Sequence, residues 1–443
     1  MDFKRKLGWL KPPAAPIAVA ETASAEPAPR REPTLTVRDA TASELSPSRV
    51  EALVTLRAQM QAILSRESRA SSPLPRPVRK EPDIVELPFV RHETPKGPVF
   101  RRLERLAPSY HVGRIPVDAA LAARSEALAL LALDPLLADA DPTRALYLDT
   151  ETTGLGGSGT IAFLVGLAWF DEGQLVIEQL ILRRPSEEAA LLAALTERIE
   201  AASSLVTFNG KAFDIPTLAG RYVMNRLREP PRRPHLDLLH VARRLHRTRV
   251  GSCTLRSVEG EVLGFVRDAD IDGADVAPRY GHYLRTGDES VLRSVVEHNT
   301  WDVVSMAALV GLYGEPLGAL HRDDLVGLAR TYRRARAYEH AVAAADAAVT
   351  RGAGAEGLRV RGEIAKARGD RRRALEDFEA LAGTLDDAAA RFELVKLYEH
   401  FVKEPSRALE LLAQGTGERP EAAERRRTRL EKKAEAVRAK QRG

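Results

Sequence analysis

The sequence contains a single cysteine, Cys253, and few aromatic residues. One thiol can form neither a disulfide within the chain nor a zinc site built from several cysteines, so a reducing compartment is expected. The longest apolar stretch, IAFLVGLAWF at 161–170, is too short to cross a bilayer. The apolar stretch APIAVA at 15–20 is short and interrupted by proline, which argues against a signal peptide. We therefore predict a cytoplasmic protein that does not enter the membrane.

The bulk composition allows a folded protein of more than one domain. The chain has 443 residues, 44% of them hydrophobic, which is enough for two or three domains with sizeable cores. Lysine and arginine number 67 against 62 aspartate and glutamate, a formal surplus of +5. A surplus this small does not identify a partner, so the distribution of the charges matters more than their sum.

The N-terminal part is rich in proline. Residues 1–100 hold 14 of the 27 prolines, with many Ala, Ser, Glu and Arg residues. This composition predicts a mostly disordered arm over 1–100, with one short amphipathic helix at 50–64. Residues 101–144 are interpreted as a lead-in segment with some helix.

From residue 145 the sequence alternates between strand-like and helix-like segments. Three adjacent strands are followed by helix, strand and helix, which predicts an α/β fold with a mixed β-sheet flanked by helices over 145–315. The expected strands are 145–151, 160–170, 174–182, 204–210 and 235–239, and the expected helices include 186–202 and 214–227.

The C-terminal part is predicted to be entirely helical. Ala341, Ala374 and Ala408 occupy equivalent places in three similar segments, spaced by 33 and 34 residues. That period over 320–415 resembles tetratricopeptide repeats, although another array of helical hairpins fits as well. Such repeats predict a protein partner. Residues 416–443 form a basic tail with helical character.

Two carboxylates stand at the end of the first strand of the α/β segment. In the stretch LYLDTETTG, Asp149 and Glu151 are two residues apart, so both side chains leave the strand on the same face. Neighbouring carboxylates repel each other, and a hard divalent cation removes that penalty. The alternative for this pair alone is a solvated acidic strand end.

Three further residues extend the pattern. Asp214 follows the fourth strand, and His298 and Asp302 lie one helical turn apart in an apolar helix. Taken singly, Asp214 is compatible with a helix N-cap and His298 with a buried core histidine. The ordered combination of Asp-x-Glu, a later Asp and His-x-x-x-Asp is much more specific.

These residues carry a resemblance to a known family. YLDTETTG, FNGKAFD and HNTWD resemble the three motifs of the DEDD superfamily of 3′→5′ exonucleases, and the sequence between them is similar to the YprB-type ribonuclease H-like family. The resemblance implies a ribonuclease H-like fold and two Mg²⁺ or Mn²⁺ ions held by Asp149, Glu151, Asp214 and Asp302. It also implies that Glu151 orients the attacking water and that His298 is the general base. Histidine-type members usually have one more residue between His and Asp; the three residues here match the tyrosine type.

Candidate substrate-binding residues lie between the second and third motifs. Asn209 is placed to bond a terminal nucleotide or to stabilise a turn, and Lys211 to approach a phosphate or remain solvated. Residues 221–256 contain ten arginines against two acids, a pattern that favours a phosphate backbone but also fits a solvated helix face. The arginines selected as substrate-binding are Arg243, Arg244 and Arg247.

The sequence therefore predicts a metal-dependent nuclease that hydrolyses phosphodiester bonds, as a 3′→5′ exonuclease on single-stranded DNA or RNA. The alternative is a catalytically inactive nucleic-acid-binding or scaffold protein whose repeats recruit partners. Metal binding by the carboxylates distinguishes the two.

Overall fold

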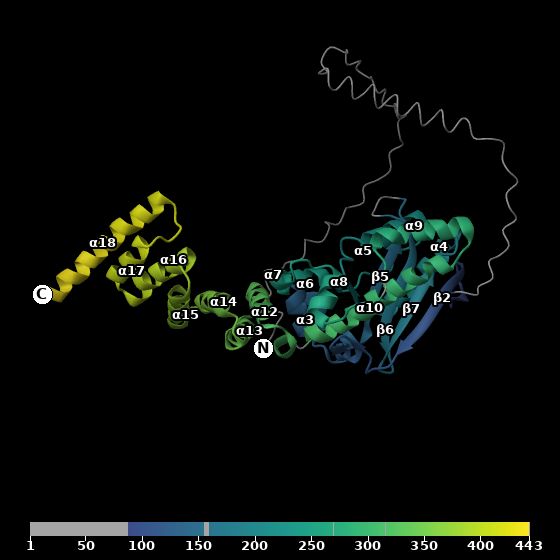
Figure 1. The fold of residues 1–443 in the computed structure, drawn as a ribbon, viewed down its shortest axis with the longest axis horizontal. Coiled ribbons are helices and arrows are strands. Elements are labelled where there is room, and N and C mark those ends of the chain that lie inside the picture. The colour runs from purple at the N-terminus through teal and green to yellow at the C-terminus, as the bar shows by residue number, and fades with distance from the viewer. Residues whose placement is uncertain (1–86, 155–158, 269, 315, 443) are drawn as a thin grey trace, which may run out of the picture. The chain divides into compact units, whose positions relative to one another are not determined.

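The computed structural model of the protein describes residues 87–442, apart from 155–158, 269 and 315 (Figure 1). Most of the predicted disordered arm and its helix at 50–64 lie outside the described residues. In the described part of the chain, a mixed sheet with flanking helices is followed by an all-helical region, which confirms the predicted fold class.

A seven-stranded sheet organises the first half of the described chain, in the order β1-β2-β7-β6-β5-β8-β9. Strands β5, β8 and β9 are parallel, and the other neighbouring pairs are antiparallel. The expected strands from residue 145 onward are confirmed. The bounds are β1 Val90–Thr94, β2 Gly97–Leu106, β5 Ala145–Thr152, β6 Ala162–Asp171, β7 Gln174–Ile181, β8 Ser204–Thr207 and β9 His235–Asp237.

The hairpin β1–β2 corrects two predicted boundaries. Residues up to 100 were expected to be disordered and 101–144 to be a lead-in, yet this hairpin extends the sheet beyond β7. Val99 is fully buried and Phe89 nearly so, which places this segment in the core of the α/β domain. Its prolines and arginines masked the strand pattern, and the hairpin stands at one end of the strand order, near the sheet edge where such residues are tolerated. The rest of the lead-in contains a short antiparallel ribbon of β3 (His111–Val112) and β4 (Ile115–Pro116), and helix α3 (Ser125–Ala132).

Helices pack on the sheet and connect its strands. The predicted helices are confirmed as α4 (Glu188–Ala201) and α5 (Asp214–Met224), and α9 (Gly273–Thr286) and α10 (Arg293–Gly314) follow later. Helix α10 lies across β5, β6 and β7 (Figure 1). A Cβ at Gly314 would lie 2.6 Å from the Ala123 side chain, so glycine allows the end of α10 to pack closely on the preceding segment.

The helical region consists of successive antiparallel pairs. Ala341, Ala374 and Ala408 are all fully buried in the second helix of their pair, which agrees with their small size. The helical array is thereby established, while its kinship to tetratricopeptide repeats stays a prediction. The helices are α12 Arg322–Arg334, α13 Tyr338–Thr350, α14 Gly354–Arg368, α15 Arg371–Thr384, α16 Ala388–Leu397, α17 Pro405–Ala413 and α18 Pro420–Arg442.

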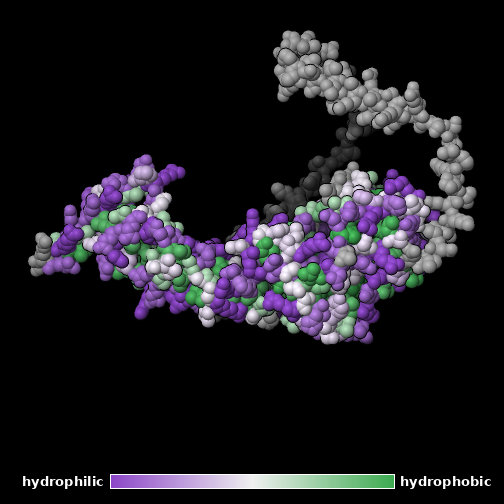
Figure 2. Space-filling model, viewed as in Figure 1, coloured by the Kyte–Doolittle hydropathy of each residue, from purple (hydrophilic) through white to green (hydrophobic). Residues whose placement is uncertain are grey.

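Helix α12 packs against α6 (Leu238–Leu245) of the α/β domain. A Cβ at Gly327 would lie 2.6 Å from the Arg244 carbonyl oxygen, so only glycine permits this approach. Asp324 of α12 pairs with Arg249 at 2.7 Å and with His246 at 3.1 Å. Among the described residues, no helix is long and apolar enough to span a membrane. The face drawn in Figure 2 is mainly hydrophilic, with scattered apolar patches.

Candidate active site

Strand β5 presents the first two carboxylates, and β8 leads to the third. Because β5 and β8 are parallel, their carboxyl ends meet at the same edge of the sheet. Asp214 is the first residue of α5, which follows β8, and Phe213 takes the N-cap position. Thr150, between Asp149 and Glu151, donates a hydrogen bond of 2.5 Å to Asp214. The strand order therefore brings these three acids together.

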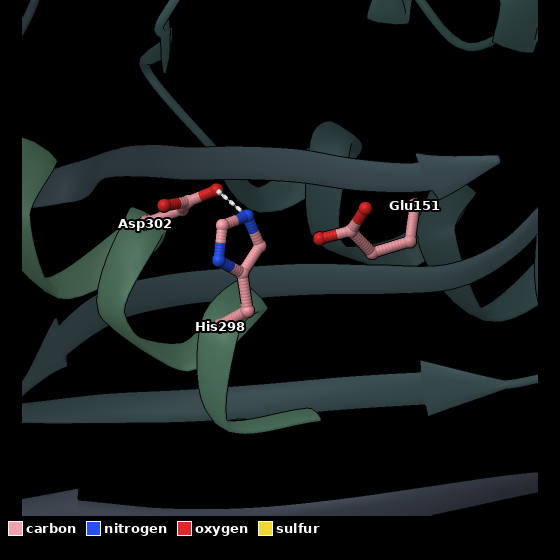
Figure 3. Close-up of side chains that lie close together, drawn as sticks. All are labelled: Glu151, His298 and Asp302. Carbon is pink, nitrogen blue, oxygen red and sulfur yellow. Dashed lines mark ion pairs between the residues drawn. The ribbon is translucent and has the colours of Figure 1, made fainter. Parts of the chain in front are cut away.

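Helix α10 adds His298 and Asp302. The two residues lie one turn apart, with 3.7 Å between the imidazole Nε2 and an oxygen of Asp302. In Figure 3 the imidazole lies between the carboxylates of Glu151 and Asp302. One ligand atom from each of these three residues lies within 4.8 Å of the others. Asp149 and Asp214 lie outside this tightest group but are close enough to couple to it electrostatically.

Burial and mutual repulsion shift the pKa values of the acids. Burial, followed by the charges of Asp302 and Asp214, raises the pKa of Asp149 well above its usual range. Burial and Asp302 also raise the pKa of Glu151 to about 8. The pKa of Asp214 is raised to about 6 by burial, although the Thr150 hydrogen bond opposes the shift. Oxygen ligands that repel one another in a buried place suit a hard divalent cation.

Asp270 holds the imidazole of His298. The ring Nδ1 lies 2.6 Å from an Asp270 oxygen, so the other nitrogen, Nε2, is directed toward Asp302. Burial alone would lower the pKa of His298, but Asp302 and Asp270 outweigh it and raise that pKa. Asp270 was missed as a site residue. It lies in the segment RDADIDG, which contains three aspartates, and the sequence does not distinguish the one that contacts His298.

Arg267 was also missed. Its guanidinium is almost fully buried and bonds Glu259 at 2.6 Å. It also contacts Asp302, so that carboxylate is shared between the cluster and a cation of the protein. A charged arginine buried on a loop can be recognised only once its partners are known, which explains why sequence reasoning overlooked it.

Comparison with known proteins agrees with this geometry. Residues 146–313 match the family model RNase_H_2, described as RNase_H superfamily. This segment is an RNase H-superfamily domain. The chain is also 39% identical, over 166 residues, to the uncharacterized protein YprB of Bacillus subtilis (strain 168). That alignment covers 37% of this chain and 40% of the relative, so the chain spans less than half of the relative's length. RNase H-like nucleases generally use divalent metals, and the cluster of Glu151, His298 and Asp302 in this segment is a possible site for such an ion.

The turn after β8 carries two of the predicted substrate-binding residues of the RNase H domain. Asp237, at the end of β9, accepts hydrogen bonds from the backbone N–H groups of Asn209, at 2.9 Å, and Lys211, at 3.0 Å. Asn209 has a φ of 71°, a left-handed conformation that asparagine tolerates. Both side chains are exposed, so they lie on the surface beside the start of α5.

The arginines of α6 and α7 (Arg247–Val250) divide into two kinds. Arg244 is half-buried and donates to the Leu131 carbonyl at 2.5 Å, and burial lowers its pKa to about 10. Part of its guanidinium is therefore engaged by the protein, and its selection as a substrate-binding residue stays a prediction. Arg243 and Arg247 are exposed. Asp237 is the N-cap of α6, next to the Asn209 turn, and both arginines lie beyond the first turn of that helix.

Proposed function

We propose that this protein is a metal-dependent 3′→5′ exonuclease that hydrolyses the phosphodiester bonds of single-stranded DNA or RNA. The observation that supports the proposal is the gathering of Asp149, Glu151, Asp214 and Asp302 from three separate segments, with raised pKa values for the first three. Burying acids together is costly unless a cation joins them. Acids gathered for structure alone would destabilise the fold without any compensating benefit.

Each carboxylate has a role in this proposal. Asp149 couples electrostatically to the other three acids, and together with Glu151, Asp214 and Asp302 it would hold two Mg²⁺ or Mn²⁺ ions. The ions, when bound, supply the positive charge that polarises the phosphodiester and activates water. Glu151 also accepts a hydrogen bond from the attacking water and orients it.

His298 is the proposed general base. Asp270 fixes the ring through Nδ1, which leaves Nε2 to accept the proton of the attacking water. The shorter spacing to Asp302, typical of tyrosine-type relatives, places the imidazole beside Glu151 and Asp302. Asp270 thus gives His298 the support that a base requires, in a position where tyrosine-type relatives have a phenol.

The substrate is proposed to reach the cluster past the turn after β8. The exposed side chains of Asn209 and Lys211 contact the terminal nucleotide and its phosphate. Arg243 and Arg247 bind the phosphate backbone farther along the strand. The helical region recruits a protein partner, and the protein acts in the cytoplasm.

The test is digestion of 5′-labelled single-stranded DNA and RNA, side by side, with Mn²⁺ or Mg²⁺. A 3′→5′ exonuclease yields a ladder of progressively shorter labelled products and leaves circular single strands intact. Asp149→Asn is the matched inactive control. Cleavage of circles would replace the exonuclease assignment by an endonuclease. No cleavage, together with no Mn²⁺ binding by calorimetry, would favour the scaffold alternative.

A further inference from the structure

A row of residues crosses four strands and ends at Asp149. Arg102 of β2 pairs with Gln179 of β7, Gln179 with Gly166 of β6, and Gly166 with Asp149 of β5. Residues directly opposite one another in neighbouring strands point to the same face of the sheet. The row therefore runs from the β1–β2 hairpin to the candidate site on one face.

Asn299 of α10 bridges the gap that Gly166 leaves in this row. Arg102 donates to the Gln179 side-chain oxygen at 2.9 Å, and the Gln179 amide nitrogen donates to the Asn299 oxygen at 2.9 Å. The Asn299 amide nitrogen then donates to an Asp149 oxygen at 2.8 Å. Gln179 and Asn299 are both completely buried. The result is a continuous relay of hydrogen bonds from the guanidinium of Arg102, through Gln179 and Asn299, to the carboxylate of Asp149.

Arg102 sets the direction of the whole relay. A guanidinium can only donate, so the oxygen of Gln179 must face Arg102 and its NH₂ group must face Asn299. The Asn299 oxygen is thereby engaged, and its NH₂ group must point at Asp149. Gln179 also donates to the Val296 carbonyl at 2.8 Å, which satisfies its second N–H. Neither amide can flip without breaking several buried hydrogen bonds.

Glycine at position 166 is required by this arrangement. A Cβ there would lie 2.2 Å from the Asn299 oxygen and 2.7 Å from its Cγ. These atoms belong to a buried side chain that is held at both ends, so it has no room to move aside. Alanine at residue 299 would remove the three nearest of these atoms, because all three lie beyond the Cβ of Asn299.

We infer that Asn299 is a positioning residue that, oriented through Gln179 by Arg102, holds the Asp149 carboxylate in place for the metal ion. The inference rests on the proposed function and extends it. The bond to Asn299 engages one oxygen of Asp149 and leaves the other available to a metal. The relay also makes the β1–β2 hairpin, which precedes the matched segment 146–313, part of the working site.

The first test measures Mn²⁺ affinity of the full chain by calorimetry, together with the melting temperature. Asn299→Ala is expected to weaken Mn²⁺ binding by about 10–100-fold, as is usual when a residue behind a metal ligand is lost. Thr196→Ala is the matched control, since it removes a hydrogen bond of 2.9 Å to Tyr222 and touches none of the site residues. Normal Mn²⁺ affinity in Asn299→Ala would overturn the inference, as would an equal loss in Thr196→Ala.

The second test is a double-mutant cycle between positions 166 and 299. Gly166→Ala alone is expected to weaken Mn²⁺ binding because it displaces Asn299. In the Asn299→Ala background the same change is expected to cost nothing further. Additive losses would show that Gly166 and Asn299 act separately and would reject the relay.

A third pair of variants applies even if Asn299→Ala does not fold. Arg102 is partly exposed, so its replacement perturbs the core less. Arg102→Ala is expected to weaken Mn²⁺ binding, and Arg102→Lys, which keeps a cationic donor, to restore part of it. Equal affinities in the parent and both variants would contradict the relay. A parent protein that binds no Mn²⁺ would instead reject the proposed function.

Discussion

The candidate site of the RNase H domain and the helical region surround their buried acids in opposite ways. In the RNase H domain, the strongest charged neighbour of both Asp149 and Glu151 is another acid, Asp302. In the helical region, Glu399 is fully buried yet lies 2.7 Å from both Arg429 and Lys433 of α18. Burial alone would raise the pKa of Glu399, but these two cations lower it to about 2.

This difference distinguishes acids that are available to a ligand from acids that stabilise the fold. Glu399 is neutralised by the protein itself, so it connects α18 to the helical turn Tyr398–Val402 that follows α16. Asp377, paired with Arg361 at 2.6 Å, is a second example in the same region. In the candidate site, Asp302 contacts Arg267, whereas Asp149, Glu151 and Asp214 are left for a ligand to neutralise. A buried acid surrounded by other acids therefore indicates a functional site more strongly than burial alone.

The largest expected effect comes from removing a site acid. Asp149→Asn should lower the nuclease rate by at least about 10³-fold, since metal binding is lost. The metal-free melting temperature should stay equal or rise, because a repulsive charge has gone. Steady-state cleavage assays and thermal melts check both results. A variant with the parent's rate would show that these acids do not carry the chemistry.

The next effect concerns His298, the one base in the acidic cluster. His298→Ala should lose about 10²–10⁴-fold in rate. Because the pKa of His298 is raised, the parent's rate should climb with pH through a value above the ordinary 6.5 and then level off. The variant should lose this rise while retaining Mn²⁺ affinity. A large loss of affinity would instead make His298 a metal ligand.

The two regions should also respond oppositely to pH. The folded-state pKa values of Glu151 and Asp214 are raised, to about 8 and about 6, so their contribution to stability is present at low pH. That contribution is lost as pH rises through those values. The depressed pKa of Glu399 gives stability above its ordinary 4.5 that is lost as pH falls through about 2. Melting curves of metal-free protein should show both trends.

Variants assign each of these trends to its region. Glu151→Gln should flatten the loss of stability between pH 5 and 8, whereas Glu399→Gln should leave it unchanged. Glu399→Gln should cost about 2 kcal/mol of unfolding free energy at neutral pH, because it leaves half-exposed cations without their partner. The nuclease rate of that variant should match the parent's. A slope that survives in Glu151→Gln would assign it to other groups.

The smallest effect separates exposed from occupied arginines within the RNase H domain. Replacing Arg243 and Arg247 together with alanine should weaken nucleic-acid binding and flatten its salt dependence by about 1 to 2 units of slope. Arg244→Ala should destabilise the fold, since it removes the bond to Leu131, and should leave the salt slope unchanged. Binding measured over a series of salt concentrations checks both. Equal slopes in all three proteins would make these arginines a solvated face.

Local patterns predicted much of the architecture. The alternation of apolar runs with glycine and acidic turns was sufficient for β5 to β9, and the helical spacing was sufficient for α4 and α5. The repeat of buried alanines located the helical pairs. The β1–β2 hairpin was missed because its proline and arginine content resembles a disordered segment, and its strands become recognisable only when paired with β7.

The sequence by itself was sufficient to predict Asp149, Glu151, Asp214, His298 and Asp302 as site residues, because they stand in an ordered pattern that chance or a solvated surface rarely produces. Only the tertiary structure decided what supports them. Asp270 reaches His298 across 28 residues, and Asn299 reaches Asp149 across 150. Arg243 and Arg244 are adjacent on α6, yet Arg243 is exposed whereas Arg244 is half-buried and bonds Leu131. Such partners are set by packing between distant segments, and a single sequence contains no local signal for them.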